Sequence, residues 1–159
     1  MKTIPLTKGY AAMVDDEDYL ALSQFKWQAL LTRGGQPVYA RRAGKTASGK
    51  KVTILMHAFI CGYSRPDHVD GDGLNNQRLN LRLATHGQNN ANRRKAHGKS
   101  SVFLGVNWKQ TNNKWCAQIK QDGKKRHIGL FKDEFDAATA YNFAALEAHG
   151  DFARFNTPQ

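Results

Sequence analysis

The sequence has few cysteines and no long apolar run, and each shortage excludes a class of protein. Its 159 residues include only Cys61 and Cys116, which stand far apart with no C-x-x-C spacing, so we expect neither a zinc knuckle nor a disulfide framework. No apolar stretch approaches the roughly 18 residues of a membrane span, and no signal-peptide-like apolar region follows Met1-Lys2-Thr3. We therefore expect a soluble, intracellular protein with reduced thiols and no membrane partner.

Acidic residues are also scarce relative to basic ones. The chain carries 24 Lys and Arg against 13 Asp and Glu, which gives a formal net charge of +11 and a pI near 9.9. The imbalance is greatest from His86 to Phe131, where ten Lys or Arg face a single acid, Asp122. Such an excess of positive charge indicates a polyanionic partner.

The first sixty residues predict short strands and helices rather than a repeat. Tyr10 to Val14 is a short apolar run, and the acids from Asp15 to Asp18 can begin a helix. Gly34-Gly35 predicts a turn. Val52 to Cys61 predicts a strand that runs into a helix, which Gly62 would end. With 40% hydrophobic residues, compact cores are expected.

The stretch from Asp67 to Asn89 carries the strongest chemical signal. It reads DHVDGDGLNNQRLNLRLATHGQN. A hard cation such as Mg²⁺ needs few protein ligands beside water and phosphate, and the carboxylate of Asp67 with the amide oxygen of Asn89 could supply them. His68 could accept a proton near neutral pH, and the amide carbonyl of Asn80 could fix its tautomer. Because adjacent strand residues point to opposite faces, Asp67 and His68 are expected to leave opposite sides of the strand.

Three other interpretations of this stretch stay open. A calcium loop that begins at His68 would place Asp70, Asp72 and Gly73 correctly, but it would end at Leu79 instead of Glu. Asp, Gly and Asn are also common turn residues, so the stretch could be only a hairpin loop. Finally, a nuclease site could be present but inactive.

These residues resemble the ββα-metal site of the HNH nucleases, in particular the homing endonucleases of phages and introns. The resemblance implies that Asp67 and Asn89 bind the metal, His68 is the general base and Asn80 orients it. The last site residue is Asn89 rather than His, and N-L-R-L-A-T from Asn80 to Thr85 is typical of the homing branch. The resemblance also implies Mg²⁺, or else Mn²⁺, as the cofactor. It further implies the cytoplasm of a bacterial or phage-infected cell as the location.

Residues 91–159 predict a linker followed by a small sheet and one helix. The linker is basic, and Arg93, Arg94 and Lys95 are its candidates for phosphate contact. Strands are predicted at 105–108, 114–121 and 124–131, the last two joined by Asp122-Gly123. Trp115, Ala117 and Ile119 would face the core, with polar residues on the other face. A helix should then begin after Asp133, bury an alanine-rich stripe and stop at Gly150.

This segment resembles the ethylene-response-factor type of DNA-binding domain. The resemblance rests on G-V, K-W-x-A-x-I, I-G-x-F, A-A-x-A-Y-N-x-A-A and the closing G-x-x-A-x-x-N, over Ser101 to Asn156. It implies that the open face of the sheet binds duplex DNA. Carried over by position, the DNA-binding residues would be Asn107, Lys109, Gln118, Lys120, Lys125 and His127. Most of these differ from the plant residue types, so base preference does not transfer.

The sequence therefore predicts an α+β protein in four parts. These are a strand-rich segment (1–50), an HNH nuclease module with a ββα-metal core (51–90), a basic linker (91–100) and a DNA-binding domain of three antiparallel strands packed on one helix (101–159). The expected activity is metal-dependent hydrolysis of a phosphodiester in double-stranded DNA, producing a nick when a monomer acts, with a dimer left open. The alternative is a DNA-binding regulator whose nuclease motif is inactive.

Overall fold

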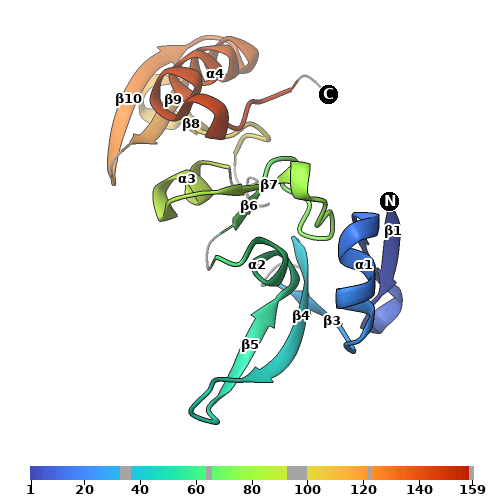
Figure 1. Ribbon diagram of the computed structural model, residues 1–159. Coiled ribbons are helices and arrows are strands. Elements are labelled where there is room, and N and C mark those ends of the chain that lie inside the picture. Colours follow the sequence, from blue (N-terminus) through green and yellow to red (C-terminus); the bar gives the residue numbers. More distant parts are fainter. Residues whose placement is uncertain (33–36, 64–65, 93–99, 122, 158–159) are drawn as a thin grey trace. The chain divides into compact units, whose positions relative to one another are not determined.

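The computed structural model describes residues 1–32, 37–63, 66–92, 100–121 and 123–157 (Figure 1). The chain divides into two compact units, Met1–Ala84 and Thr85–Gln159, each with its own buried apolar residues. Both mix helices with small antiparallel sheets, which confirms the α+β class. Among the described residues, no helix combines the length and the apolar character of a membrane span. The predicted Gly34-Gly35 turn lies outside the described residues.

The described residues of unit 1 form three small sheets and two α-helices. Its elements are β1 (Lys2–Pro5), β2 (Ala11–Val14), α1 (Asp16–Ser23), β3 (Gln28–Leu31), β4 (Val38–Lys45), β5 (Lys51–Leu55), α2 (Met56–Cys61), β6 (Pro66–His68) and β7 (Leu81–Leu83). β1 pairs with β2, β4 lies between β3 and β5, and β6 pairs with β7, all antiparallel. As predicted, acids begin α1, and α2 follows directly from β5 and ends at Gly62 in a left-handed conformation with φ of 71°.

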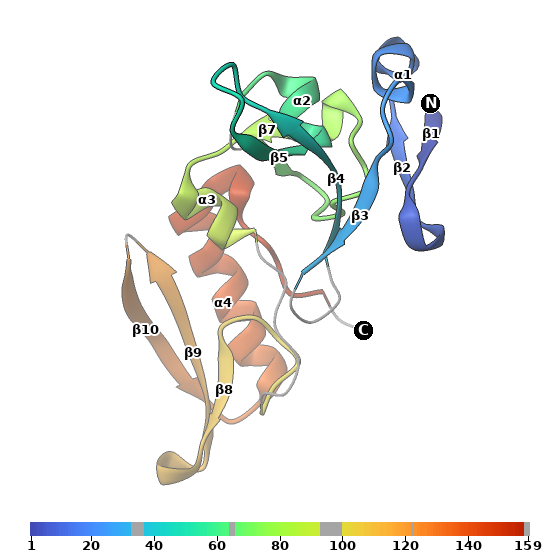
Figure 2. The ribbon, with the colours of Figure 1, turned by 90° about the horizontal axis from the view of Figure 1, so that it is seen from below.

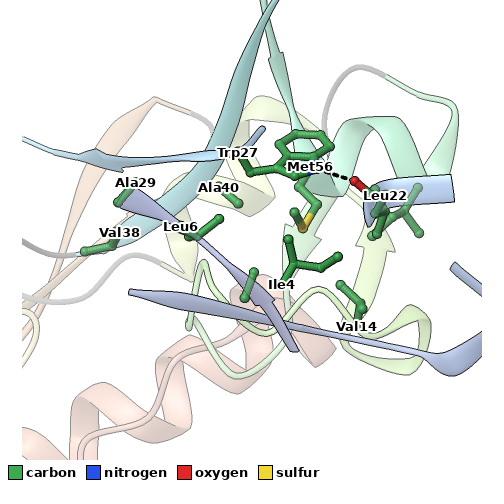
Figure 3. Close-up of a cluster of buried hydrophobic side chains, with 11 residues drawn as sticks. Ile4, Leu6, Val14, Leu22, Trp27, Ala29, Val38, Ala40 and Met56 are labelled. Carbon is green, nitrogen blue, oxygen red and sulfur yellow. Dashed lines mark hydrogen bonds between the residues drawn. The ribbon is translucent and has the colours of Figure 1, made fainter. Parts of the chain in front are cut away.

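One core joins the first fifty residues to the following segment. Leu22 of α1 and Met56 of α2 are almost completely buried in the same cluster, and Trp27 donates a 2.9 Å hydrogen bond from Nε1 to the carbonyl oxygen of Leu22 (Figure 3). The boundary predicted at residue 50 falls between the paired strands β4 and β5. The described structure thus groups residues 1–50 and 51–84 in one unit, because apolar residues from both segments bury one another.

The β6–β7 loop is held by the beginning of the chain. Met13 in β2 exchanges backbone hydrogen bonds with the loop, accepting from Asn76 N and donating to the carbonyl of Leu74, both at 2.8 Å. Asp15 accepts from Arg78 N at 2.8 Å, and the Arg78 guanidinium pairs with Asp18. The strand-rich segment therefore positions the loop that carries the acidic and amide side chains.

Unit 2 has the predicted sheet and helix (Figure 2). Its elements are α3 (His86–Ala91), β8 (Val106–Lys109), β9 (Lys114–Gln121), β10 (Lys124–Phe131) and α4 (Glu134–His149). The sheet order is β10-β9-β8. Asp133 caps α4 by accepting from Phe135 N at 2.7 Å and Asp136 N at 3.2 Å, and α4 stops before Gly150.

The buried face of this sheet matches the sequence pattern. Ala117 and Ile119 in β9 are buried against alanines of α4 and against Tyr141, with Trp115 packed at the edge. Gly105, which directly precedes β8, allows the backbone to approach Tyr141 of α4 closely, because a Cβ built on Gly105 would overlap the Tyr141 ring. The fold thus leaves the opposite face of the sheet for polar side chains.

Candidate nuclease site and DNA interface

The β6–β7 hairpin sets the direction of the two adjacent candidate residues. Asp67 lies opposite Arg82, and His68 lies opposite Leu81. The Asp67 carboxylate pairs with the Arg82 guanidinium, whereas the His68 ring contacts other rings. The two side chains therefore have different surroundings, as the alternation of a strand requires.

His68 lies in a buried cluster of rings. His68 is only 5% exposed to solvent. The His57 ring stands nearly perpendicular to it, with centroids 4.9 Å apart, and Tyr39 lies 5.6 Å from His57 and 5.9 Å from His68. Burial lowers the pKa of His68, although Asn76 and nearby carboxylates oppose the shift. Burial, followed by the charge of His68, lowers the pKa of His57 to about 3. Both imidazoles are consequently neutral at pH 7.

The carboxamide that the structure describes beside His68 is Asn76, not the predicted Asn80. Asn76 is fully buried, and its Oδ1 lies 3.5 Å from His68 Nε2. Because a carbonyl oxygen can only accept, this contact favours a proton on Nε2 and a lone pair on Nδ1. Nδ1 is then the ring atom that could accept a proton.

Asn80 instead ties the hairpin loop together. Its Oδ1 accepts from Asp70 N at 3.1 Å, and its Nδ2 donates to Asp70 Oδ1 at 3.0 Å and to the carbonyl of Asn75 at 2.8 Å. The reason is the register: Leu81, not Asn80, lies opposite His68. Burial alone would raise the pKa of Asp70, but hydrogen bonds from Asp72 N, Asn75 and Asn80 lower it. Asp70 and Asn80 therefore make a fixed turn.

The loop also packs closely onto β4. A Cβ built on Gly73 would lie 2.6 Å from a carbon of the Tyr39 ring and would overlap the carbonyl oxygen of Val38. Only glycine fits this position without movement of the backbone. The contact brings the loop against the same Tyr39 that touches both histidines.

Asn89 lies in α3, which begins unit 2. Thr85 and Gln88 cap this helix reciprocally, since Thr85 N donates to Gln88 Oε1 at 2.8 Å and Gln88 N donates to Thr85 Oγ1 at 3.3 Å. Asn89 Oδ1 is shielded from solvent without a hydrogen-bond partner among the described residues. Such an orphaned amide oxygen fits the donor type that Mg²⁺ prefers. Asp67 and Asn89 belong to different units, so their shared metal site stays a prediction.

The described residues include no group of three or more His, Cys, Asp or Glu side chains that could hold a metal. The predicted site does not require one, because it uses one carboxylate and one amide. The donor types fit a hard cation, and the Asp67 carboxylate already holds a cationic group, the Arg82 guanidinium.

The predicted DNA-binding residues of unit 2 share one face of the sheet. The register pairs Gln118 with His127, Lys120 with Lys125 and Asn107 with Cys116, so these side chains lie opposite the face that packs on α4. Gln118 Nε2 donates to Asn107 Oδ1 at 3.2 Å, and Cys116 Sγ lies 3.4 Å from His127 Nδ1. Lys109 ends β8 on the same face. Arg93, Arg94 and Lys95 lie outside the described residues.

Sequence reasoning missed three residues around the hairpin: Tyr39, Asn76 and Arg82. Arg82 stands within the N-L-R-L phrase, and its position opposite Asp67 follows from the hairpin register. That register could have been inferred only with the loop length known. Tyr39 comes from β4, so no pattern local to the hairpin could have found it.

Comparison with known proteins supports both halves of this description. No protein-family model matches the sequence. The chain is 32% identical over 150 residues to an uncharacterized HNH endonuclease of Acanthamoeba polyphaga mimivirus, covering 94% of this chain and 76% of that protein. It is also 32% identical over 89 residues to Protein 3.8 of Escherichia phage T7, covering 56% of this chain and 73% of that protein.

A third similarity is to an ethylene-responsive transcription factor of Arabidopsis thaliana. Identity is 35% over 63 residues, which covers 38% of this chain and 34% of the plant protein. It is therefore a partial similarity, in keeping with a shared module. The long match to the mimivirus protein, together with the Asp-His hairpin and its Asn-rich loop, shows that the chain belongs to the HNH endonuclease family.

Proposed function

We propose that this protein is a metal-dependent DNA endonuclease of the homing type, which nicks duplex DNA held by its C-terminal sheet. The observation that carries the proposal is the β6–β7 hairpin, where Asp67 and His68 are adjacent but point to different surroundings. The ββα-metal arrangement would be β6, β7 and the Asn89-bearing helix α3.

His68 is the proposed general base. Its lowered pKa keeps the imidazole neutral at pH 7, and with the Nε2 proton directed at Asn76, Nδ1 would take a proton from the attacking water. Tyr39 and His57 both contact the ring. Asn80 supports the base indirectly, by fixing the loop.

Asp67 and Asn89 are the proposed metal ligands, with Mg²⁺ as the expected ion and Mn²⁺ as the substitute. A cation bound there would stabilise the charge that develops on the phosphate and leaving oxygens. Asp67 would supply a carboxylate oxygen and Asn89 its orphaned amide oxygen. One such site cuts one strand, so we expect a nick from a monomer.

The open face of the β8–β10 sheet is the proposed duplex-binding surface. Lys109, Lys120 and Lys125 would contact phosphates, and Asn107 and Gln118 would contact base edges. A sheet of this width fits a major groove. The basic linker residues Arg93, Arg94 and Lys95 would add phosphate contacts.

The test is nicking of supercoiled plasmid in Mg²⁺. The wild type should convert plasmid to open circles, and His68→Ala should lower the rate by at least about 100-fold, because a general base contributes roughly that much or more, while DNA affinity is retained. His149→Ala, in the last turn of α4, is the matched control and should nick normally. Equal activity of His68→Ala and wild type would refute the mechanism.

A second function has support in two observations. His68 is only 5% exposed, and Asp67 is occupied by Arg82, as would suit a DNA-binding regulator with an inactive nuclease motif. Binding without cleavage, on genomic DNA and with several divalent ions, would favour that alternative.

A further inference from the structure

The carboxylate assigned to the metal is held by an arginine in the described structure. Arg82 Nε and Nη2 lie 3.1 and 3.0 Å from Asp67 Oδ2. The two residues are direct partners in the β6–β7 ladder, so the hairpin itself brings them together. The guanidinium therefore donates two hydrogen bonds to one carboxylate oxygen from a fixed position.

This ion pair is more enclosed than the others in the described part of the chain. The Arg82 and Asp67 side chains are 20% and 11% exposed. By contrast, Arg78 is 51% exposed in its pair with Asp18, and Arg126 and Glu147 are 45% and 72% exposed. Water therefore screens the Arg82–Asp67 attraction least, and the pair should persist in solution.

The pair creates a competition at Asp67. A guanidinium and a divalent cation are both positive, so they repel each other when they share one carboxylate in a shielded place. The planar fork of arginine is also well matched to phosphate oxygens. A DNA backbone that reached the hairpin would thus offer Arg82 a second anionic partner.

We propose that Arg82 couples metal binding to DNA binding at this site. In the free chain Arg82 neutralises Asp67 and lowers its affinity for a divalent cation. On the duplex the guanidinium moves to a backbone phosphate, and the released carboxylate oxygen binds the cation. The inference rests on the proposed function, and by linkage it requires that metal also strengthens DNA binding by the same factor.

The first experiment measures Mn²⁺ binding to the full-length chain without DNA. Arg82→Gln should bind Mn²⁺ on the order of 10-fold more tightly than wild type, within the usual range of coupling between sites. Arg126→Gln is the matched control, since it removes the same charge from an exposed pair, and its affinity should equal that of wild type. Arg82→Lys, which keeps the charge but loses the fork, should show a smaller increase.

The outcomes separate this inference from the proposed function. If Asp67→Asn binds Mn²⁺ as wild type does, the metal site itself is wrong and both fail. If Asp67→Asn weakens binding but folded Arg82→Gln and Arg82→Lys match wild type, only the role of Arg82 is overturned. A weaker affinity in the Arg82 variants would likewise overturn it, because a purely structural pair predicts that result.

The second experiment needs no metal. DNA affinity in EDTA is measured for wild type, Asp67→Asn, Arg82→Gln and the double variant. Removal of Asp67 should release Arg82 to phosphate and tighten DNA binding several-fold, and this gain should disappear in the Arg82→Gln background. Equal gains in both backgrounds would show that the effect is only the loss of a negative charge, and would overturn the proposal.

Discussion

At the scale of single residues, the protein buries two neutral histidines. His57 and His68 face each other at 4.9 Å, and Tyr39 touches both. Neither ring can take up a proton without charging a poorly solvated place beside another imidazole. The cluster therefore keeps its proposed base neutral but makes the fold sensitive to acid.

That sensitivity has a definite sign. The folded-state pKa of His57 is about 3, below the unfolded value of about 6.5, so the unfolded chain binds more protons between these values. Stability is full above pH 6.5 and falls as the pH decreases, by about 1.4 kcal/mol per pH unit for each histidine that stays neutral. His57→Phe keeps a ring but removes one titrating group.

We expect unfolding free energies measured in urea from pH 7 to pH 5 to decline less steeply for His57→Phe than for wild type, by about 1 kcal/mol per pH unit averaged over this range. His149→Phe, in the last turn of α4, is the control and should keep the wild-type slope. Parallel curves for His57→Phe and wild type would show that His57 is not buried in its neutral form.

Residue types at the site were predictable where the chemistry is local. Asp67, His68 and Asn89 were predicted from their order along the chain, and the structure places the first two on the β6–β7 hairpin and the third on α3. Their roles as metal ligands and base stay predictions. The contact between Asn76 and the His68 ring was not predicted. Asn76 and Asn80 belong to the same loop, and only the backbone conformation of that loop decides which carboxamide lies beside the ring. Arg82 required the cross-strand register, which a loop of unknown geometry conceals.

At the scale of elements, the C-terminal sheet separates a packed apolar face from an open polar face. Odd-numbered positions of β9 face the core, and even-numbered positions join polar residues of β8 and β10. The Gln118–Asn107 hydrogen bond holds two carboxamides side by side. Carboxamides pair well with adenine, whereas lysines contact phosphate without regard to sequence.

Two substitutions on this face should therefore behave differently. Gln118→Ala should relax base preference at one position of a selected site, by about 1–3 kcal/mol. Lys120→Ala should weaken all duplexes alike and reduce the slope of log affinity against log salt by about 0.9. Selection from a randomised duplex library, followed by salt titration, measures both. If Gln118→Ala kept the wild-type base preference, this face would not read sequence.

The strands and helix of this unit were predictable because alternation and capping are encoded locally. Lys114–Gln121 and Lys124–Phe131 were predicted with their observed bounds, and Asp133 with its role as cap. The grouping of residues 1–84 in one unit was not predictable from the sequence, because the strands of this unit come from segments that share a core only after folding. Composition alone could not show that β4 pairs across the predicted boundary.

At the scale of the whole molecule, two separate cores imply two separable stabilities. Met56 is fully buried in unit 1, and Ile119 is buried in unit 2. Met56→Ala should destabilise unit 1 by about 2–5 kcal/mol and raise amide hydrogen exchange there, with little change in β9 and α4. Ile119→Ala should give the reverse pattern. Uniform loss of protection across both units in either variant would contradict this independence.

The hydrogen bond from Arg78 N to Asp15 spans 63 residues of chain, and Met13 bonds the same loop. Contacts this distant in sequence close late, since the loop-closure entropy is lost before they form. During translation the amino-terminal strands leave the ribosome before the loop that they hold. A circular permutant that began at β3 would reverse this order of synthesis, because the β6–β7 hairpin would be made before the segment with Met13 and Asp15 that holds its loop.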